Sequence, residues 1–358
     1  MLIWIGGVVP AYHSLFKAIQ NHTELIILSP PQWRHGSKLF KEPLPKGAYT
    51  LIQTPFFPSG SSRYLIPLLP FFLLKYRPSH IYLMDEFDRP NTCLHNLIIK
   101  LFCPSAYLIT YSLQKNKKPN YYRYYHFLSL RINCRLINKV IAASSQAASV
   151  VRQHGYKHEI AIIPLGASQD YFYPGEALPL RNKHNIPLNK TIIIYAGSLS
   201  EQKGIKQVVE CLSQSDNTIL ITAGTGPLKQ TLQKIAGDTI RQFGVADVSL
   251  LRELYQLSDY VILPSQSTSD WQEQIGRSLI EGILCGCTAL GCNSGFIPEI
   301  TLFPETLFEE GDKDGLCRML KNLHELDKTR IFEKQLNKVT KDFLWEHIGE
   351  KTFNFIQS

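Results

Sequence analysis

Short apolar runs alternate along the chain with segments whose apolar residues recur at helical spacing. Each apolar run ends in a loop rich in glycine or polar residues, a pattern typical of buried parallel strands. We predict strands at 2–5, 24–28, 79–84, 106–110, 139–143, 160–166, 191–196, 218–223, 259–263 and 288–290. Helical segments such as 11–20, 251–257 and 279–284 lie between them. This alternation predicts an α/β fold with parallel sheets.

A polar segment at 180–190 separates two halves that each alternate strands with helices. The chain has 358 residues, which is long for one hydrophobic core and ample for two. We therefore predict two Rossmann-like, doubly wound domains at 1–170 and 171–340, followed by a terminal helical segment at 341–358.

The composition describes a folded protein with an excess of basic residues. Hydrophobic residues make up 44% of the chain and charged residues 19%, which excludes an intrinsically disordered chain. The net charge of +8 and the sequence pI of about 8.9 favour anionic partners such as nucleotide sugars, acidic lipids or nucleic acid.

The eight cysteines indicate neither a metal site nor a disulfide framework. Cys285, Cys287 and Cys292 lie close together, but no neighbouring histidine completes a zinc ligand set, so buried thiols are the better interpretation. Such cysteine usage fits a reducing cytoplasm. The N-terminus has no basic leader, and prolines break the most apolar run, 64–74. We therefore expect neither a signal peptide nor a membrane-spanning helix.

The segment 115–139 combines lysine and arginine with tyrosine and phenylalanine. A solvated helix face with an aromatic core side is one interpretation. Docking on anionic lipid headgroups is another, because basic residues are attracted to such a surface and tyrosines suit the membrane interface. Nucleic acid is the weakest of the three, because no helix-turn-helix, RRM or zinc-finger pattern accompanies the charge.

The chemistry is concentrated where a buried strand gives way to a polar loop and a helix. The backbone N–H groups near Ile275, Gly276 and Arg277 begin that helix, where unpaired donors and the helix dipole favour an anion. Glu273 lies just before the helix, and Glu281 lies eight positions later, about 12 Å along a helix axis. Carboxylates accept hydrogen bonds from sugar hydroxyls. The alternative is two surface glutamates on an ordinary amphipathic helix.

Glycine-containing loops follow several other predicted strands. The loop from Gly197 to Gly204 places Lys203 just before a helix, so that backbone N–H groups and one cation could hold a diphosphate. The other loops contain Gly6, Gly7, Gly224 and Gly295. Each could bring the backbone close to a ligand, although a tight turn explains a lone glycine equally well.

Several residues of the second half form a pattern together: Pro264-Ser265, Glu273, Gly276, Glu281-Gly282, Cys285-Gly286, Asn293-Ser294-Gly295 and Pro298-Glu299. This pattern resembles the donor-binding signature of retaining glycosyltransferases of family 4. The resemblance implies the GT-B architecture, in which two Rossmann-like domains face one another across a cleft. It further implies that the first domain binds the acceptor, the second binds a nucleotide sugar, and the terminal helix packs back on the first.

The resemblance also implies roles for individual residues. Glu281 would bind ribose hydroxyls, Glu273 sugar hydroxyls and Lys203 the donor phosphates, with no metal required. Further donor contacts are expected at Gly6, Gly7, Gly197, Ser198, Gly224, Pro264, Ile275, Gly276, Arg277 and Gly295. The family pattern has arginine where Ser198 stands, and Arg277 is the candidate to compensate for it.

Acceptor-side residues are expected in the first half. Glu86, at the carboxyl end of a predicted strand, is a candidate for binding acceptor hydroxyls or orienting a catalytic group. The alternative role, a helix N-cap, suits Asp88 better. Many members of the resembled family carry a histidine in the loop after the 106–110 strand. This chain has Gln114 and Asn116 there instead, and Trp33 is a further acceptor-side candidate.

The sequence therefore predicts a hexosyltransferase that uses a UDP- or GDP-linked sugar and retains anomeric configuration. The expected acceptor is a glycan, a lipid-linked sugar or a small molecule in surface polysaccharide or glycoconjugate synthesis. We expect a cytoplasmic protein with peripheral contact between 115–139 and the anionic inner face of a membrane, and no nucleic acid partner. Two other classes stay open. One is a sugar-nucleotide hydrolase or epimerase with an acid–base pair such as Glu86 and a histidine, and the other is a non-catalytic nucleotide-sugar-binding protein.

Overall fold

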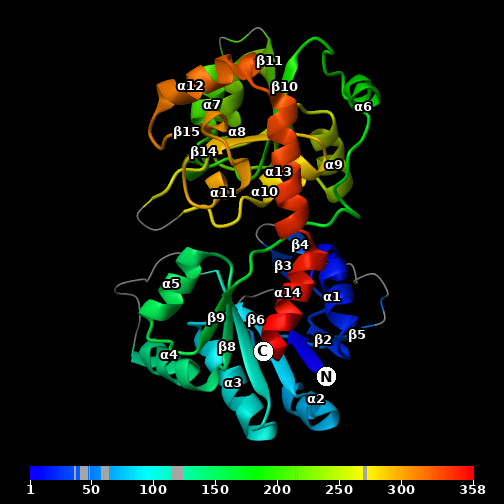
Figure 1. Ribbon diagram of the computed structural model, residues 1–358, viewed down its shortest axis with the longest axis vertical. Coiled ribbons are helices and arrows are strands. Elements are labelled where there is room, and N and C mark those ends of the chain that lie inside the picture. Colours follow the sequence, from blue (N-terminus) through cyan, green and yellow to red (C-terminus); the bar gives the residue numbers. More distant parts are fainter. Residues whose placement is uncertain are drawn as a thin grey trace. The chain divides into compact units, whose positions relative to one another are not determined.

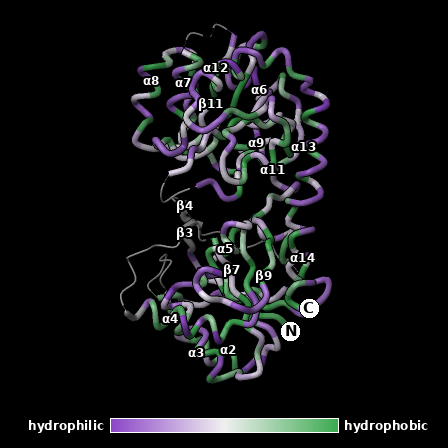
Figure 2. The backbone as a smooth tube through the Cα atoms, turned by 60° about the vertical axis from the view of Figure 1, so that its left-hand side comes forward, coloured by the Kyte–Doolittle hydropathy of each residue, from purple (hydrophilic) through white to green (hydrophobic). Residues whose placement is uncertain are grey.

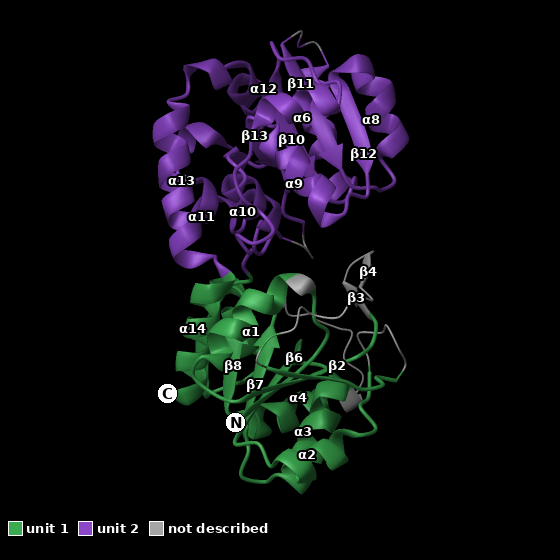
Figure 3. Ribbon diagram, turned by 90° about the vertical axis from the view of Figure 1, so that its right-hand side faces the viewer, with its two compact units in different colours: residues 1–165, 345–358 green, residues 166–344 purple. Residues whose placement is uncertain are grey.

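The computed structural model describes residues 1–35, 38–40, 47, 49–57, 64–113, 124–213, 215, 217–268 and 272–358. The chain forms two compact units (Figure 3). Unit 1 comprises Met1–Leu165 and Trp345–Ser358, and unit 2 comprises Gly166–Leu344. The predicted boundaries at 170 and 340, and the domain roles attached to them, stay predictions.

Unit 1 is built on a seven-stranded parallel sheet with the strand order β5-β2-β1-β6-β7-β8-β9 (Figure 1). Its strands are β1 (Leu2–Ile5), β2 (Leu25–Ser29), β5 (Thr50–Gln53), β6 (His80–Glu86), β7 (Tyr107–Ser112), β8 (Lys139–Ala142) and β9 (Glu159–Ile162). β3 (Trp33–His35) and β4 (Lys38–Phe40) form a separate antiparallel ribbon. Its helices are α1 (His13–Gln20), α2 (Leu69–Tyr76), α3 (Pro90–Phe102), α4 (Tyr124–Leu136), α5 (Ser145–Gln153) and α14 (Trp345–Gln357), with a 3-10 turn at Pro10–Tyr12.

The core of unit 1 follows from the apolar strands. Ile3 pairs with Ile26 on one side and with Ile81 on the other, and each of these side chains is at most 1% exposed. In Figure 2, hydrophobic colour runs through the strands at the centre of each unit. A strand buried on both faces needs helices on both faces, which the alternating helical segments supply.

The terminal helix α14 packs against α1 in unit 1. The rings of Trp345 and Tyr12 meet with their centroids 5.0 Å apart. Gly349 allows the two helices to approach closely, because a Cβ at that position would lie 2.6 Å from the Cβ of Ala18. Trp345 is 2% exposed and so lies in the core of unit 1.

Unit 2 is built on a six-stranded parallel sheet with the strand order β12-β11-β10-β13-β14-β15. Its strands are β10 (Thr191–Ala196), β11 (Thr218–Ala223), β12 (Ile240–Gly244), β13 (Tyr260–Leu263), β14 (Thr288–Cys292) and β15 (Leu307–Phe308). Its helices are α6 (Ala177–Lys183), α7 (Ile205–Leu212), α8 (Lys229–Ala236), α9 (Val248–Gln256), α10 (Arg277–Leu284), α11 (Ile297–Thr301), α12 (Lys313–Lys321) and α13 (Lys328–Asp342). Short 3-10 turns occupy Glu201–Lys203, Gly237–Thr239, Pro304–Thr306 and Leu323–Glu325.

Both sheets confirm the predicted α/β class with two Rossmann-like, doubly wound units. In each, the chain winds outward from a central strand, returns across it and winds in the opposite direction. No described helix combines the length and the apolar character needed to cross a membrane.

Several sequence-based expectations differ from the structure. Trp33 lies in the short strand β3, and neither β3 nor β5 was predicted. Part of the predicted linker at 180–190 belongs to α6. The N-cap of α3 is Arg89 and not Asp88, and the Arg89 side chain makes no capping hydrogen bond.

The expectation of no disulfide is wrong for one cysteine pair. Cys211 of α7 and Cys317 of α12 form a disulfide, with Cα atoms 5.1 Å apart. The two helices pack side by side, and an ion pair of 2.6 Å between Lys313 and Glu210 also joins them. The pair is separated by 106 positions in the sequence, so no spacing pattern reveals it. Cys285, Cys287 and Cys292 are buried free thiols, as predicted.

Candidate functional site

Apart from Gly6 and Gly7, which lie in unit 1, the predicted donor-binding residues lie in unit 2, around the carboxyl ends of its central strands. β10 and β13 are neighbours in the sheet, but the connections that follow them run to opposite sides of it. In open α/β sheets this reversal leaves a crevice between the two loops, where ligands bind. The loop after β10 carries Lys203, and the loop after β13 carries Ser265 and Glu273.

Glycines allow the loops around this crevice to pack backbone against backbone. Gly204 has φ +66°, and a Cβ there would lie 2.0 Å from the carbonyl oxygen of Pro264. A Cβ at Gly224 would lie 1.9 Å from the carbonyl oxygen of Gly197. The Gly197 N–H donates to the carbonyl of Ala223 at 2.9 Å. The glycines are therefore explained by contacts between the loops themselves.

Lys203 and Glu273 form an ion pair between the two loops. Lys203 Nζ donates to Glu273 Oε2 at 2.6 Å, and Ser265 Oγ donates to the same oxygen at 3.0 Å. The two charged side chains are 19% and 15% exposed, so water screens the pair only partly. Burial raises the pKa of the Tyr195 phenol, and the negative charge of Glu273 raises it further. Tyr195 therefore remains a neutral hydroxyl beside this cluster.

The helix α10 begins beside the ion pair. Gly276 caps it in the left-handed conformation, with φ 58° and ψ 41°. Glu281 lies on its second turn and accepts a hydrogen bond from Tyr255 Oη at 3.3 Å. Arg277 Nε lies 3.4 Å from Glu281 Oε1, so the residue proposed to replace the family arginine is paired with this carboxylate. Burial raises the pKa of Glu281, while Arg277 and the Tyr255 hydroxyl oppose the shift.

The remaining predicted donor residues of unit 2 support this arrangement through their backbone. Gly295 lies against Glu273, since a Cβ there would be 2.3 Å from the Glu273 carbonyl oxygen. The Phe296 N–H donates to that same oxygen at 3.2 Å. The carbonyl of Ser198 accepts a hydrogen bond from Tyr195 Oη at 2.7 Å. Ile275 is buried.

Two residues of this site were missed by sequence reasoning. Tyr195 reads as one more apolar position of a buried strand, and its hydroxyl gives no linear signal. Tyr255 lies on α9, and its contact with Glu281 exists only because α9 packs against α10. The Tyr195 hydroxyl binds the predicted loop at Ser198, and the Tyr255 hydroxyl binds the predicted carboxylate of Glu281.

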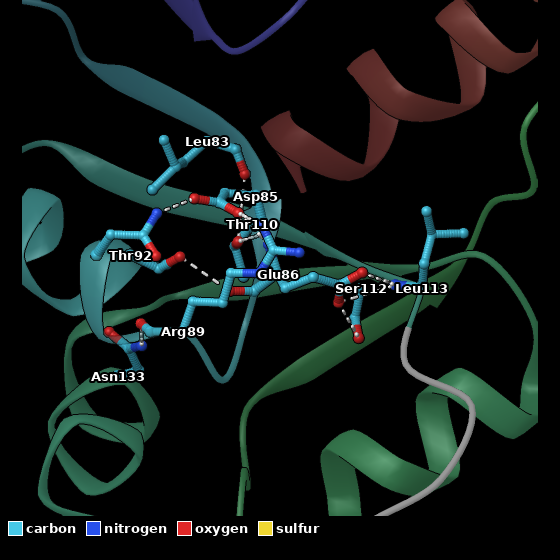
Figure 4. A network of polar contacts seen from close by, with 10 residues as sticks. Leu83, Asp85, Glu86, Arg89, Thr92, Thr110, Ser112, Leu113 and Asn133 are labelled. Atoms are coloured by element: carbon cyan, nitrogen blue, oxygen red, sulfur yellow. Dashed lines mark hydrogen bonds and ion pairs between the residues drawn. The ribbon is translucent and has the colours of Figure 1, made fainter. Parts of the chain in front are cut away.

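A second polar cluster lies at the end of β6 in unit 1 (Figure 4). Asp85 is a buried carboxylate that accepts hydrogen bonds from Arg89 Nη1 at 2.9 Å and from Asn91 Nδ2 at 2.5 Å. Thr110 Oγ1 of the neighbouring strand donates to the Asp85 carbonyl at 2.8 Å. Gly6, after β1, lies close to this strand, with a Cβ there 3.0 Å from the Cβ of Met84.

Glu86 joins the end of β6 to the end of β7. The Leu113 N–H donates to both carboxylate oxygens at 3.2 Å, and Ser112 Oγ lies 3.5 Å from Oε2. Burial raises the pKa of Glu86 to about 7, the charge of Arg89 opposes the shift, and Asp88 adds to it. Burial also raises the pKa of Asp85 to about 6, against the charge of Arg89. Glu86 can therefore exchange a proton near neutral pH.

Other predicted residues are placed only in part. Gln114 and Asn116 lie outside the described residues, and of Trp33 only the backbone is described, in β3. Gly7 follows β1 and is buried. Within the described part of the chain, no three histidine, cysteine, aspartate or glutamate side chains are grouped so that they could hold a metal ion.

Residues 178–337 match the family model described as Glycosyl transferases group 1. The matched segment lies inside unit 2 and contains Lys203, Glu273 and Glu281. Among curated proteins, the chain is 24% identical over 212 residues to the lipopolysaccharide 1,2-N-acetylglucosaminetransferase of Salmonella typhimurium. That match covers 54% of this chain and 55% of the relative, so the chain spans about half the length of that protein.

Solved structures share the fold over the whole chain. Sucrose-phosphate synthase from Thermosynechococcus elongatus has a TM-score of 0.73 at 16% identity, covering 99% of this chain and 98% of the other. Anabaena HepE, solved in complex with UDP and glucose, has a TM-score of 0.71 at 15% identity, covering 99% of each chain. At these identities the likeness establishes the fold, which is that of the GT-B glycosyltransferases.

Proposed function

We propose that this chain is a retaining hexosyltransferase of family 4. The proposal starts from its GT-B fold and from its match to the group 1 glycosyltransferase model. The enzyme takes a sugar from a nucleoside-diphosphate sugar and transfers it to a hydroxyl of a glycan, a lipid-linked sugar or a small molecule. The observation that carries the proposal is the Lys203–Glu273 ion pair, at the strand-order reversal of unit 2 and beside the start of α10.

The arrangement suits departure of a nucleoside diphosphate. Negative charge grows on the leaving phosphate as the glycosidic bond breaks. A cation and helix N–H groups already held in place stabilise that charge without reorganising. We assign the cation to Lys203 and the N–H groups to the turn from Ile275 to Arg277. Ser265 and Gly204 keep Lys203 near this turn by fixing the two loops against each other.

The carboxylates of Glu273 and Glu281 stand on either side of the turn from Ile275 to Arg277 in the sequence. Both described contacts of the Glu273 carboxylate are made by Oε2, and we assign Oε1 to hydroxyls of the transferred sugar. Glu281 we assign to the ribose hydroxyls. With no side-chain nucleophile proposed, an oxygen of the leaving phosphate takes the acceptor proton on the same face of the sugar. The new bond then forms where the old one broke, which retains configuration.

For the donor we propose a UDP-linked sugar first and a GDP-linked sugar second. A solved structure with the same fold binds UDP, and a curated relative transfers N-acetylglucosamine to lipopolysaccharide. These likenesses favour a glycan or lipid-linked acceptor in surface polysaccharide synthesis. We assign acceptor binding to unit 1, where the Glu86 carboxylate accepts a hydrogen bond from the N–H of Leu113, the residue before Gln114 in the sequence.

A thermal-shift panel of UDP-, GDP-, ADP-, dTDP- and CMP-sugars tests the donor assignment. We expect one nucleotide class to raise the Tm of the wild type and to leave that of Glu281→Gln unchanged. Glu333→Gln, an exposed glutamate of α13 in the same unit, is the matched control and should keep the shift. If no donor raises the Tm of the wild type, the result would favour a non-catalytic protein or a donor site that is completed only when the acceptor binds.

Further variants separate the roles of the two cations. Lys203→Met should abolish the donor shift, whereas Arg277→Met should reduce it if Arg277 replaces the family arginine at Ser198. An unchanged shift in Arg277→Met would remove that compensation. NMR of the product's anomeric proton tests retention, and an inverted product would contradict the proposal. Release of free sugar at the same rate with and without acceptors would favour a hydrolase.

A further inference from the structure

Exposed apolar side chains are concentrated on two neighbouring helices of unit 1. Six of them form what we call the apolar ridge: Leu68 (48% exposed), Phe71 (57%) and Leu74 (55%) at α2, with Leu94 (41%), Leu97 (44%) and Leu101 (75%) on α3. α2 and α3 pack side by side, as Figures 1 and 3 both show. Their opposite sides are buried, with Leu69, Leu73 and Ile99 in the core.

The regular spacing of the leucines on α3 shows that they form a second apolar side of the helix. Leu94, Leu97 and Leu101 recur at three and four positions, which places them on one side of a helix. The other side of α3 carries Cys93, Asn96 and Ile99, all buried. One side of α3 therefore lies in the core, and the opposite side, which carries the three leucines, is apolar but exposed to solvent. Large exposed apolar side chains grouped on two packed helices in this way are typical of an interaction site.

The helices that carry the ridge and their neighbour α4 contain basic residues and no acidic ones. Between residues 43 and 158 the only acidic residues are Asp85, Glu86 and Asp88, which stand together at the end of β6 and in the turn after it. The same stretch of sequence has fifteen lysines and arginines, of which four are exposed on or beside the helices of the ridge. Lys75 and Arg77 border the ridge at the end of α2, and Arg131 and Arg135 are exposed on the adjacent helix α4. α2, α3 and α4 contain no acidic residue.

We propose that the apolar ridge docks unit 1 on an anionic lipid surface. Leucine and phenylalanine side chains enter the boundary between headgroups and acyl chains, as the apolar face of an interfacial helix does. The surrounding cations are attracted to acidic headgroups, each contributing about a five-fold gain in partitioning. The six apolar residues of the ridge lie outside the segment 115–139, to which the sequence had assigned lipid contact, whereas Arg131 and Arg135 belong to that segment. The proposal does not depend on the transferase activity.

A second copy of the chain fits this surface less well. Pairing two ridges would bring Lys75 and Arg77 of one copy near the same residues of the other, and like charges across an interface oppose association. An anionic lipid surface offers an apolar interior for the leucine and phenylalanine side chains and negative headgroups for the lysines and arginines. The uniform sign of charge therefore favours lipid over self-association.

Flotation of the full chain with vesicles tests the proposal, without donor or acceptor. We expect binding to vesicles of phosphatidylcholine with phosphatidylglycerol, little binding to phosphatidylcholine alone, and weakening at high salt. The combined change Phe71→Ser, Leu97→Ser and Leu101→Ser should lower partitioning at least ten-fold. Arg131→Gln with Arg135→Gln should lower it by about 25-fold, from two basic residues at about five-fold each.

Matched variants in unit 2 control for the changes themselves. Leu178→Ser, Leu188→Ser and Val245→Ser remove apolar side chains that are 57%, 54% and 62% exposed. Lys229→Gln with Lys234→Gln removes two exposed cations of α8. Both sets should bind vesicles as the wild type does. The proposal is overturned if the wild type does not float, or if the ridge variant floats equally well. A concentration-dependent dimer that the ridge variant dissolves, seen by analytical ultracentrifugation, would also overturn it.

Discussion

At the residue scale, Gly204 fixes how closely the loop after β10 can approach the loop after β13. Its φ of +66° disfavours a side chain, and a Cβ would collide with the Pro264 carbonyl. We expect Gly204→Ala to lower the free energy of unfolding by about 3 kcal/mol, from left-handed strain of 1–2 kcal/mol and overpacking of a similar size. Urea titration measures the change.

Gly311 provides the comparison for that substitution. It has φ +79°, but a Cβ there meets nothing within 4 Å. Gly311→Ala should therefore cost only the backbone strain, about 1 kcal/mol. Equal costs at the two positions would show that the loops can separate freely. In that case, the contact between them would not hold Lys203 in place.

Individual site residues were predictable where a loop pattern carried them. Lys203, Glu273 and Glu281 stand next to glycines and predicted strand ends, so the sequence shows them at the edge of the sheet. The ion pair between Lys203 and Glu273 was not predictable, because it joins two loops 70 positions apart. Tyr195 and Tyr255 gave no signal, because a buried tyrosine and a buried leucine occupy the same place in a hydrophobic pattern.

At the scale of elements, the disulfide ties α7 to α12. It closes a loop of 106 positions, so its loss relaxes the unfolded chain considerably. We expect Cys211→Ser, or treatment with dithiothreitol, to lower the free energy of unfolding of unit 2 by about 2–4 kcal/mol. Cys134→Ser, at a half-buried free thiol, is the control: it keeps the disulfide and should respond to dithiothreitol as the wild type does, whereas Cys211→Ser should not respond. Alkylation of all eight cysteines in the unreduced, unfolded chain would contradict the bond.

The end of β6 should make stability depend on pH. The pKa of Glu86 is raised from 4.5 to about 7 in the fold, so the folded state keeps a proton that the unfolded chain releases. This contribution is complete below about pH 4.5 and is lost as the pH rises through 7. Glu86→Gln should remove a fall on the order of 2 kcal/mol in the unfolding free energy between pH 5 and 8.

His95 of α3 gives the opposite slope in the same experiment. It is fully buried, and burial lowers its pKa from 6.5 to about 4. Between these values the unfolded chain binds more protons, so stability rises with pH. His95→Phe should flatten that rise while leaving the Glu86 effect in place. Parallel pH profiles for wild type and both variants would show that neither group is perturbed.

Elements were predictable in proportion to how strongly they are buried. The strands at 2–5, 191–196 and 218–223 begin and end where the sequence places them, because a doubly covered strand is apolar throughout. β5 was missed because Thr50–Gln53 lies at the sheet edge with half of its residues exposed. The helix α2 was hidden because its apolar outer side removes the amphipathic pattern that identifies a surface helix.

At the scale of the whole molecule, the chain returns to unit 1 for its last helix. Deleting residues 345–358 would expose the face of α1 that packs on Trp345 and Gly349. We expect unit 1 to lose several kcal/mol, given about 3–5 kcal/mol for a buried tryptophan alone. Hydrogen exchange should show faster exchange in α1 and unchanged protection in α7 and α10. Glu350→Gln, an exposed change on α14, is the control.

Unit 2 begins and ends at neighbouring points of its own fold. Near its start, the Ala167 N–H donates to the Phe343 carbonyl at 2.9 Å, and Ala167 forms a parallel bridge with Leu344. The segment 166–344 is thus an insertion into unit 1 whose two ends are held together by backbone contacts. Genetic exchange between related chains could replace this whole segment at a single pair of junctions and leave the core of unit 1 intact. Under the proposed assignment of the donor to unit 2, the donor preference could then evolve by recombination as well as by point mutation.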